Sequence, residues 1–254
     1  MKSFFTLLCC ILFLGTNAQS YHPLVTTGKV WSDYYAPCDK MDPFSMYEKV
    51  TDDTIFGGYT WKKLVCAPDS TVYYWQPNGF LREEPDKKVY YTDPYGSKTW
   101  LYYDFGLAIG DTVHPLEDDI TYVVDSVTDF ELATGEFRER FVLRYIDPSG
   151  IGDSCYVYWI EGVGSLDGLT TPAKCMMVGD NPSLICFWEA GVLQYHNPDF
   201  AECYVITGIG DKEYGISDIL IYPNPTSGIS NFEFQLQELL ILNSIPLLGL
   251  RWQM

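Results

Sequence analysis

The sequence has few basic residues and almost no helical patterning. Its 254 residues include 16 Lys and Arg against 34 Asp and Glu, which gives a formal net charge of -18. No nucleic-acid partner is expected, because affinity for phosphates comes from lysine and arginine side chains. Binding to an anionic membrane surface is excluded for the same reason. Intrinsic disorder does not fit either, because hydrophobic residues make up 47% of the chain and charged residues only 20%.

In place of helical periodicity, short runs rich in Tyr, Val, Trp and Phe alternate with turn-forming residues. We expect strands at residues 59–66, 71–75, 88–92, 99–105, 121–127, 141–146, 155–160, 184–188, 192–196 and 203–207. Turns are expected at residues 77–79, 93–96, 110–111, 134–135 and 147–150. This pattern predicts an all-β fold in which an antiparallel meander forms a barrel or a strongly curved open sheet. A two-sheet β-sandwich is the alternative.

No hydrophobic run is long enough to span a bilayer. Lys2, the apolar run over residues 4–14 and the small residue Ala18 instead predict a secretory signal peptide at residues 1–18. Cleavage is expected between Ala18 and Gln19. The apolar stretch at residues 239–250 is short and contains Pro246, so no transmembrane anchor is expected.

The eight cysteines lack the close spacing of a zinc site. Cys9 and Cys10 lie inside the signal peptide, and neither follows the small residue that a lipoprotein cleavage site needs. The remaining six are Cys38, Cys66, Cys155, Cys175, Cys186 and Cys203. An even number in an exported protein predicts three disulfides, and sequence alone does not choose their connectivity.

No familiar catalytic or cofactor motif is present. The glycine cluster at residues 162–168 is close to a dinucleotide-binding spacing, but no helix is expected after it, so a turn between strands is preferred. Ser165 lacks the Gly-x-Ser-x-Gly frame of a hydrolase nucleophile. His22, His114 and His196 lie far apart and beside or near prolines. No catalytic residue, metal site or cofactor is therefore predicted.

Neighbouring acids are common, but sequence adjacency does not place two carboxylates across a cleft, as a glycosidase needs. Such neighbours occur at residues 52–53, 83–84 and 117–119. A solvated charged surface explains them without a calcium site. Glu161 follows an expected strand and has two interpretations: a buried acid with a raised pKa, or a turn carboxylate that accepts backbone N–H groups.

Aromatic residues make up 16% of the chain, and adjacent tyrosines such as Tyr90 and Tyr91 must point to opposite faces of a strand. Packing between neighbouring strands is expected for most of these rings. Rings on an outer face would instead suit sugars or apolar ligands, which makes an extracellular glycan or protein a candidate partner.

Near the C-terminus, an apolar segment at residues 219–222 runs into a doubly proline-locked turn. The residues of this motif are Tyr222, Pro223, Asn224, Pro225 and Gly228. The segment resembles the opening of the C-terminal sorting domain of type IX secretion cargo from Bacteroidetes-type bacteria. The resemblance implies passage through the general secretion machinery and then the type IX secretion machinery, to a secreted or cell-surface location.

Residues 230–254 depart from the later strands of such sorting domains, so we expect an incomplete sorting domain at residues 216–254. A periplasmic location would follow if the altered tail is not recognised. Segments at residues 80–84, 103–105, 109–112, 159–165 and 197–200 also resemble a group of secreted proteins that carry such domains. The layout of that group implies a Cys186–Cys203 disulfide, which would contribute about 3 kcal/mol of stability.

The resulting prediction is a signal peptide at residues 1–18, an all-β secreted domain at 19–210 and the incomplete sorting domain. The expected role is binding or structural. The alternative is an extracellular hydrolase acting on polysaccharide or peptide. Two carboxylates, or a carboxylate and a histidine, converging in a concave pocket would favour the hydrolase. A filled barrel whose polar residues face solvent would favour the first role.

Overall fold

A computed structural model describes residues 20–36, 43–68, 74–116, 121–147, 155–173 and 182–205, and the backbone of strands 216–222 and 231–236. The chain divides into two units between Ile206 and Thr207. In the described residues there is no helix, and the strands pair antiparallel, so the predicted all-β class is confirmed.

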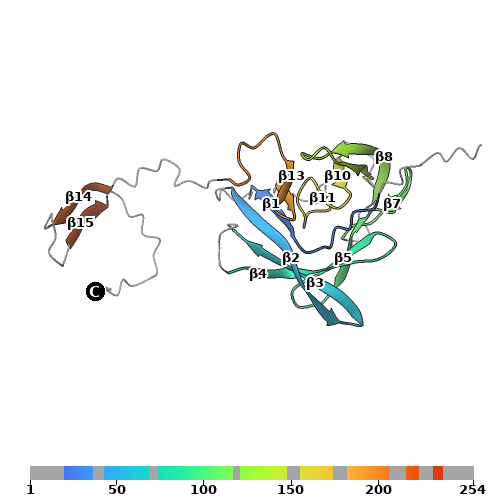
Figure 1. The fold of residues 1–254 in the computed structure, drawn as a ribbon, viewed down its shortest axis with the longest axis horizontal. Coiled ribbons are helices and arrows are strands. Elements are labelled where there is room, and N and C mark those ends of the chain that lie inside the picture. The colour runs from blue at the N-terminus through green and yellow to red at the C-terminus, as the bar shows by residue number, and fades with distance from the viewer. Residues whose placement is uncertain are drawn as a thin grey trace, which may run out of the picture. The chain divides into compact units, whose positions relative to one another are not determined.

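The first sheet curls into a half-barrel (Figure 1). Its first six strands form a meander, and a hairpin from later in the chain pairs with the first of them. Its strands run in the order β13-β12-β1-β2-β3-β4-β5-β6. Their bounds are β1 (Lys29–Tyr35), β2 (Phe44–Phe56), β3 (Tyr59–Ala67), β4 (Gln76–Glu83), β5 (Lys88–Thr92), β6 (Thr99–Asp104), β12 (Ser183–Glu189) and β13 (Val192–His196). The strongly curved open sheet is therefore the form that this meander takes.

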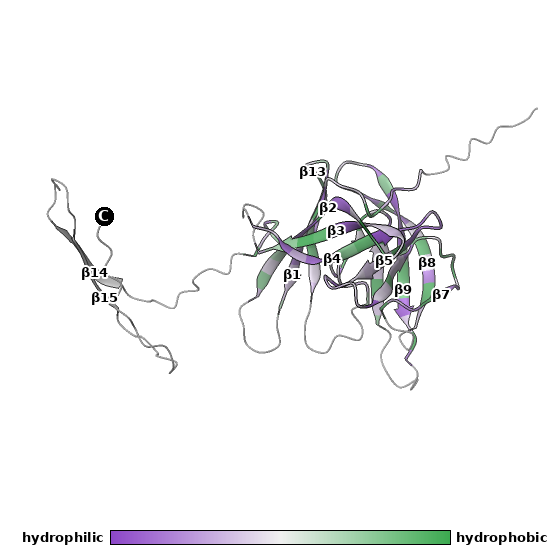
Figure 2. Cartoon of the chain, turned by 90° about the horizontal axis from the view of Figure 1, so that it is seen from below, coloured by the Kyte–Doolittle hydropathy of each residue, from purple (hydrophilic) through white to green (hydrophobic). Residues whose placement is uncertain are grey.

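The second sheet has the order β11-β10-β9-β8-β7. Its strands are β7 (Thr112–Val113), β8 (Tyr122–Glu131), β9 (Phe137–Tyr145), β10 (Tyr156–Ile160) and β11 (Gly164–Ser165). Figure 2 shows green, hydrophobic stretches on β8 and β9 as well as around β3 and β4 of the first sheet. Burying such surfaces together supplies the main driving force for folding.

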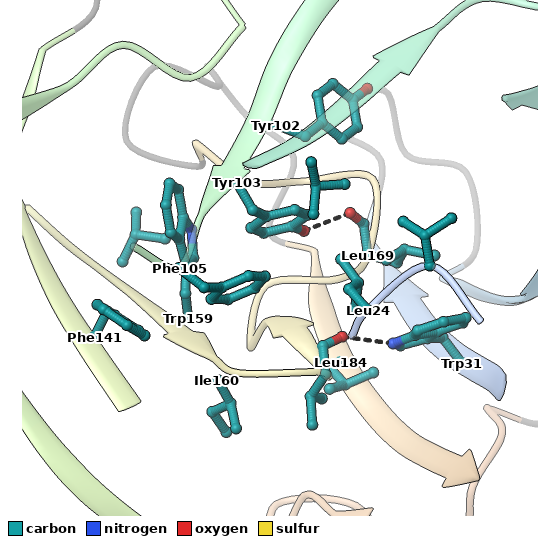
Figure 3. Close-up of a cluster of buried hydrophobic side chains, with 14 of the residues drawn as sticks. Leu24, Trp31, Tyr102, Tyr103, Phe105, Phe141, Trp159, Ile160, Leu169 and Leu184 are labelled. Carbon is teal, nitrogen blue, oxygen red and sulfur yellow. Dashed lines mark hydrogen bonds between the residues drawn. The ribbon is translucent and has the colours of Figure 1, made fainter. Parts of the chain in front are cut away.

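Large aromatic side chains from both sheets meet in the core (Figure 3). Trp159 of β10 packs edge-on against Tyr103 of β6, with ring centroids 5.1 Å apart. The buried indole N–H of Trp159 donates to the carbonyl of Pro172 at 2.9 Å, and that of Trp31 donates to Val163 at 2.7 Å. These two indoles thus keep a hydrogen-bond partner although their rings are buried.

The N-terminal described segment is part of this core. Leu24 is fully buried. The carboxylate of Glu83 accepts the backbone N–H groups of Leu24 and Val25 at 3.1 and 2.8 Å. The buried ammonium of Lys29 donates to the carbonyls of Pro23 and Gly162. These bonds fasten the segment to both sheets.

The structure corrects three local predictions. Residues 77–79 lie inside β4 rather than in a turn, and Gly79 has a φ of +133° where the ring of Tyr91 packs against its backbone. The part of the 71–75 segment that is described, Tyr74 and Trp75, is not strand. Cys203 to Val205 are not strand either, because the carbonyl of Cys203 bonds to the side chains of Ser32 and Tyr47 instead of a strand backbone.

The C-terminal unit contains two described strands, β14 (Ile216–Tyr222) and β15 (Asn231–Leu236), which pair antiparallel. A strand therefore ends at Tyr222, directly before the proline-rich segment. Pro223, Asn224, Pro225 and Gly228 lie outside the described residues, as do Ala18 and Gln19.

Candidate binding site

The face of β2 to β5 that points away from the core carries aromatic and basic side chains. Directly opposed residues in adjacent strands share a face, and so do alternate residues along one strand. The register pairs Phe56 with Tyr59, Lys63 with Phe80, and Arg82 with Tyr90. Trp61 lies between Tyr59 and Lys63 on the same face of β3. We call this surface the outer face.

A two-residue turn positions the first of these rings. Gly57 and Gly58 join β2 to β3 with φ angles of +60° and +80°, which L-residues with side chains adopt only at a cost. The turn sets Phe56 opposite Tyr59 and stacks the Phe56 ring on Trp61, with centroids 5.1 Å apart and an interplanar angle of 8°. Tyr59 remains 52% exposed at the rim.

Arg82 lies among these rings. Its guanidinium carbon is 3.9 Å from the ring centroid of Tyr59, 4.6 Å from that of Tyr90 and 5.0 Å from that of Trp61. Contacts of this kind attract a cation to the ring faces. One edge of the guanidinium also pairs with the carboxylate of Glu84.

These residues surround a cavity of about 390 Å³, which we call the Arg82 pocket. It is lined by Phe56, Gly57, Tyr59, Trp61, Arg82, Gly96 and Thr99. Two donor atoms of these lining residues, the indole Nε1 of Trp61 and the Nε of Arg82, are buried and have no acceptor among the described residues. Buried donors are almost always paired, so these two mark a place where acceptor atoms are missing.

A larger cavity of about 450 Å³ lies beside the N-terminal segment and is lined by Tyr21, Lys62 and Glu83 among others. Lys62 alternates with Trp61 along β3, so its side chain is on the opposite face of the sheet. Two of its polar groups already have partners: Lys62 pairs with Asp53 at 2.5 Å, and the Tyr21 hydroxyl donates to Glu83. Arg82 lines this cavity as well, but Trp61, which carries the second unpaired donor, does not.

Two carboxyl groups do converge, but inside the fold. Asp33 and Glu48 are buried neighbours on β1 and β2. Burial raises the pKa of Glu48 to about 7, although hydrogen bonds with Asp33, Thr170 and Asn78 oppose the rise. Burial, and then the charge of Glu48, raises the pKa of Asp33 well above its usual range. Neither acid lines the cavities of about 390, 440 and 450 Å³ that lie among the described residues, so these cavities do not bring the pair into a concave pocket.

Glu161 satisfies both interpretations of its sequence position. Its side chain is buried, and burial raises its pKa, while it accepts the backbone N–H of His22 at 2.8 Å. The glycine cluster beside it forms a turn followed by the short strand β11, as expected of a connection between strands.

The cysteines follow the prediction only in part. Cys186 and Cys203 form the expected disulfide, and Cys155 is also disulfide-bonded. The prediction is wrong for Cys66, which is a free thiol because its partners across the sheet are Glu48 and Gln76. Cys38 and Cys175 lie outside the described residues.

The structure places His196 beside the disulfide, opposite Cys186 across β12 and β13. Ligand atoms of His196, Cys186 and Cys203 lie within 4.8 Å of one another. The two sulfur atoms are bonded to each other, so the group offers a metal ion only one free ligand atom.

Arg82, Tyr59 and the Asp33–Glu48 pair are not among the site residues predicted from the sequence. The signal for the first two was available, because two glycines between aromatic residues indicate a tight hairpin whose closing residues share a face. No comparable signal exists for the acid pair, whose members come together through strand pairing.

No family model, curated protein or solved structure matches the chain. Among the described residues, no helix has the length and apolar character to cross a membrane.

Proposed function

We propose that the protein is a secreted or cell-surface saccharide-binding protein, exported by the general and type IX secretion machineries, and that the Arg82 pocket is its binding site. The observation that carries the binding proposal is the pair of unpaired buried donors, Trp61 Nε1 and Arg82 Nε, in an aromatic-lined pocket. Binding sites commonly combine an apolar lining with a few placed polar groups.

The chemistry of a sugar ring suits this pocket. A sugar presents a flat face of C–H groups, which packs on exposed rings such as Tyr59, and hydroxyl oxygens around its edge, which accept hydrogen bonds. Trp61 and Arg82 supply the donors, and Thr99 adds a hydroxyl-bearing side chain to the lining. The hydrolase alternative has weaker support, because the acids that converge are buried in the core.

Binding is tested by screening the mature protein on an array of bacterial and plant oligosaccharides, with the affinity of each hit measured by calorimetry. Tyr59→Ala should weaken binding about tenfold, because losing the ring contact should cost roughly 1.4 kcal/mol of binding free energy. Tyr156→Ala is the matched control, because Tyr156 is a 40% exposed tyrosine on β10 of the other sheet. A screen with no hit, or equal losses in both variants, would contradict the proposal.

Export is tested separately by fractionating the native host and measuring the intact mass of the protein. We expect an extracellular or surface-bound chain that begins at Gln19. A chain recovered from the cytoplasm with residues 1–18 still attached would refute the export route.

A further inference from the structure

The outer face has a different charge from the rest of the molecule. At the outward positions that the register fixes in β2, β3 and β4, the charged residues are Lys49, Lys63 and Arg82, with no Asp or Glu among them. The whole chain carries 34 acidic residues against 16 basic ones. A face with three cations and no acid therefore differs strongly from the acidic composition of the whole chain.

These cations are little neutralised by carboxylates. Lys63 is exposed, and no carboxylate among the described residues pairs with it. Lys49 lies over the ring of Trp75 with its ammonium nitrogen 3.8 Å from the centroid. Arg82 alone has an acidic partner, Glu84, which occupies one edge of its guanidinium. The face thus keeps positive charge that a ligand could neutralise.

Arg82 is held among three aromatic rings. Its guanidinium carbon lies 3.9, 4.6 and 5.0 Å from the ring centroids of Tyr59, Tyr90 and Trp61, and its Nε has no acceptor among the described residues. A guanidinium presents parallel N–H groups that match the two oxygens of a carboxylate. Because the rings hold the fork in place, little side-chain entropy is lost when an anion binds.

We propose that the ligand of the Arg82 pocket is an acidic saccharide, whose carboxylate binds Arg82 while Lys63 and Lys49 contact further acidic residues along the sugar chain. This inference rests on the proposed function and names its substrate class. Lys63 lies two residues after Trp61 along β3, on the same face. Lys49 of β2 pairs directly with Val65, the next residue of β3 on that face. The cations therefore form a line across the strands, which suits a linear polymer with regularly spaced charges.

The test compares one oligosaccharide in two forms: a linear uronic-acid oligomer, and the same oligomer with its carboxyl groups reduced to alcohols. Both are titrated into the mature protein by calorimetry at low and at physiological salt. The acidic form should bind at least tenfold more tightly, and this preference should shrink as salt rises. Lys63→Gln, at an exposed position, should reduce the preference two- to fivefold, whereas Arg82→Gln should abolish it.

Arg144→Gln is the control, because Arg144 is a partly exposed arginine on β9 of the other sheet; it should leave both affinities unchanged. Equal binding of the two forms would overturn the acidic-ligand inference and leave the proposed function standing. If neither form binds but the array yields neutral sugars as ligands, the acidic-ligand inference is likewise overturned and the proposed function stands. An oligonucleotide that binds as tightly as the uronate, with the same dependence on Lys63 and Arg82, would also overturn it, because the attraction would then be to any polyanion.

Discussion

The buried Asp33–Glu48 pair should make the fold less stable as pH rises. Glu48 is 1% exposed and Asp33 is fully buried. The Oδ1 atom of Asp33 has no donor among the described N–H and hydroxyl groups, so it is satisfied when the two carboxyls share a proton. The Leu169 backbone N–H donates to the other oxygen at 3.1 Å. The folded pair therefore retains a proton that the unfolded chain releases.

The sign and size of the effect follow from Glu48. Its pKa is about 7 in the folded protein and near its ordinary 4.5 in the unfolded chain. Because the folded state binds the proton more tightly, the contribution of Glu48 to stability is complete below about pH 4.5 and is lost as pH rises to about 7. The difference corresponds to roughly 3 kcal/mol, since each pH unit is worth about 1.4 kcal/mol.

Glu48→Gln isolates this contribution. The amide can still accept from Asn78 and Thr170 and can donate to Asp33 without binding a proton, so the variant should lose the part of the pH dependence that Glu48 contributes. Urea unfolding followed by tryptophan fluorescence from pH 5 to 8.5 should show the variant gaining about 2–3 kcal/mol on the wild type as pH rises. Asp129→Asn, at an exposed position of β8, is the control. A difference between wild type and Glu48→Gln that stays constant with pH would refute the reasoning.

Three further predictions concern stability. Cys203→Ser removes the disulfide that joins residues 17 apart in the sequence and should lower the free energy of unfolding by about 3 kcal/mol, whereas Cys66→Ser should lower it by under about 1 kcal/mol. Urea midpoints under oxidising conditions compare the two variants. Equal losses would mean that other contacts hold the loop between Cys186 and Cys203. Leu24→Ala should cost about 2–5 kcal/mol in the same assay, and a loss below about 1 kcal/mol would show that the N-terminal segment is not part of the core. Gly79→Ala should destabilise the protein more than Gly57→Ala, because a Cβ at residue 79 would lie 2.4 Å from the ring of Tyr91, whereas a Cβ at residue 57 would meet no atom within 4 Å. A lower melting temperature for Gly57→Ala than for Gly79→Ala would contradict this packing of Tyr91 on Gly79.

The sequence predicts the class of this fold because alternation and turn residues are local signals. β5 and β13 begin and end where the pattern places them. β1 and β2 were missed because each includes charged residues that disfavour strands, such as Lys29, Asp33 and Glu48. These side chains are buried with partners that are distant in sequence: Lys29 bonds to Gly162, and Glu48 bonds to Asn78 and Thr170.

The type of site could be predicted from the sequence, but its position could not. The expectation that an outer-face ring would be available to a sugar depends only on alternation, and Tyr59 fulfils the geometric part of it. The position of Arg82 among three rings depends on the register of three strand pairs, which a hairpin turn and two further connections set together. Cys66 shows the same limit, because an even cysteine count says nothing about which thiols face one another across a sheet.

The central claim, that a saccharide binds at the Arg82 pocket, is tested most directly by ¹⁵N NMR of the mature protein during titration with the uronic-acid oligomer. The account predicts that the indole N–H signal of Trp61 and the Nε–H signal of Arg82 shift together. The indole signals of Trp31 and Trp159, which already donate to core carbonyls, should stay in place. A Trp61 signal that does not move at saturating oligomer, or shifts that are equally large at the core indoles, would contradict the claim.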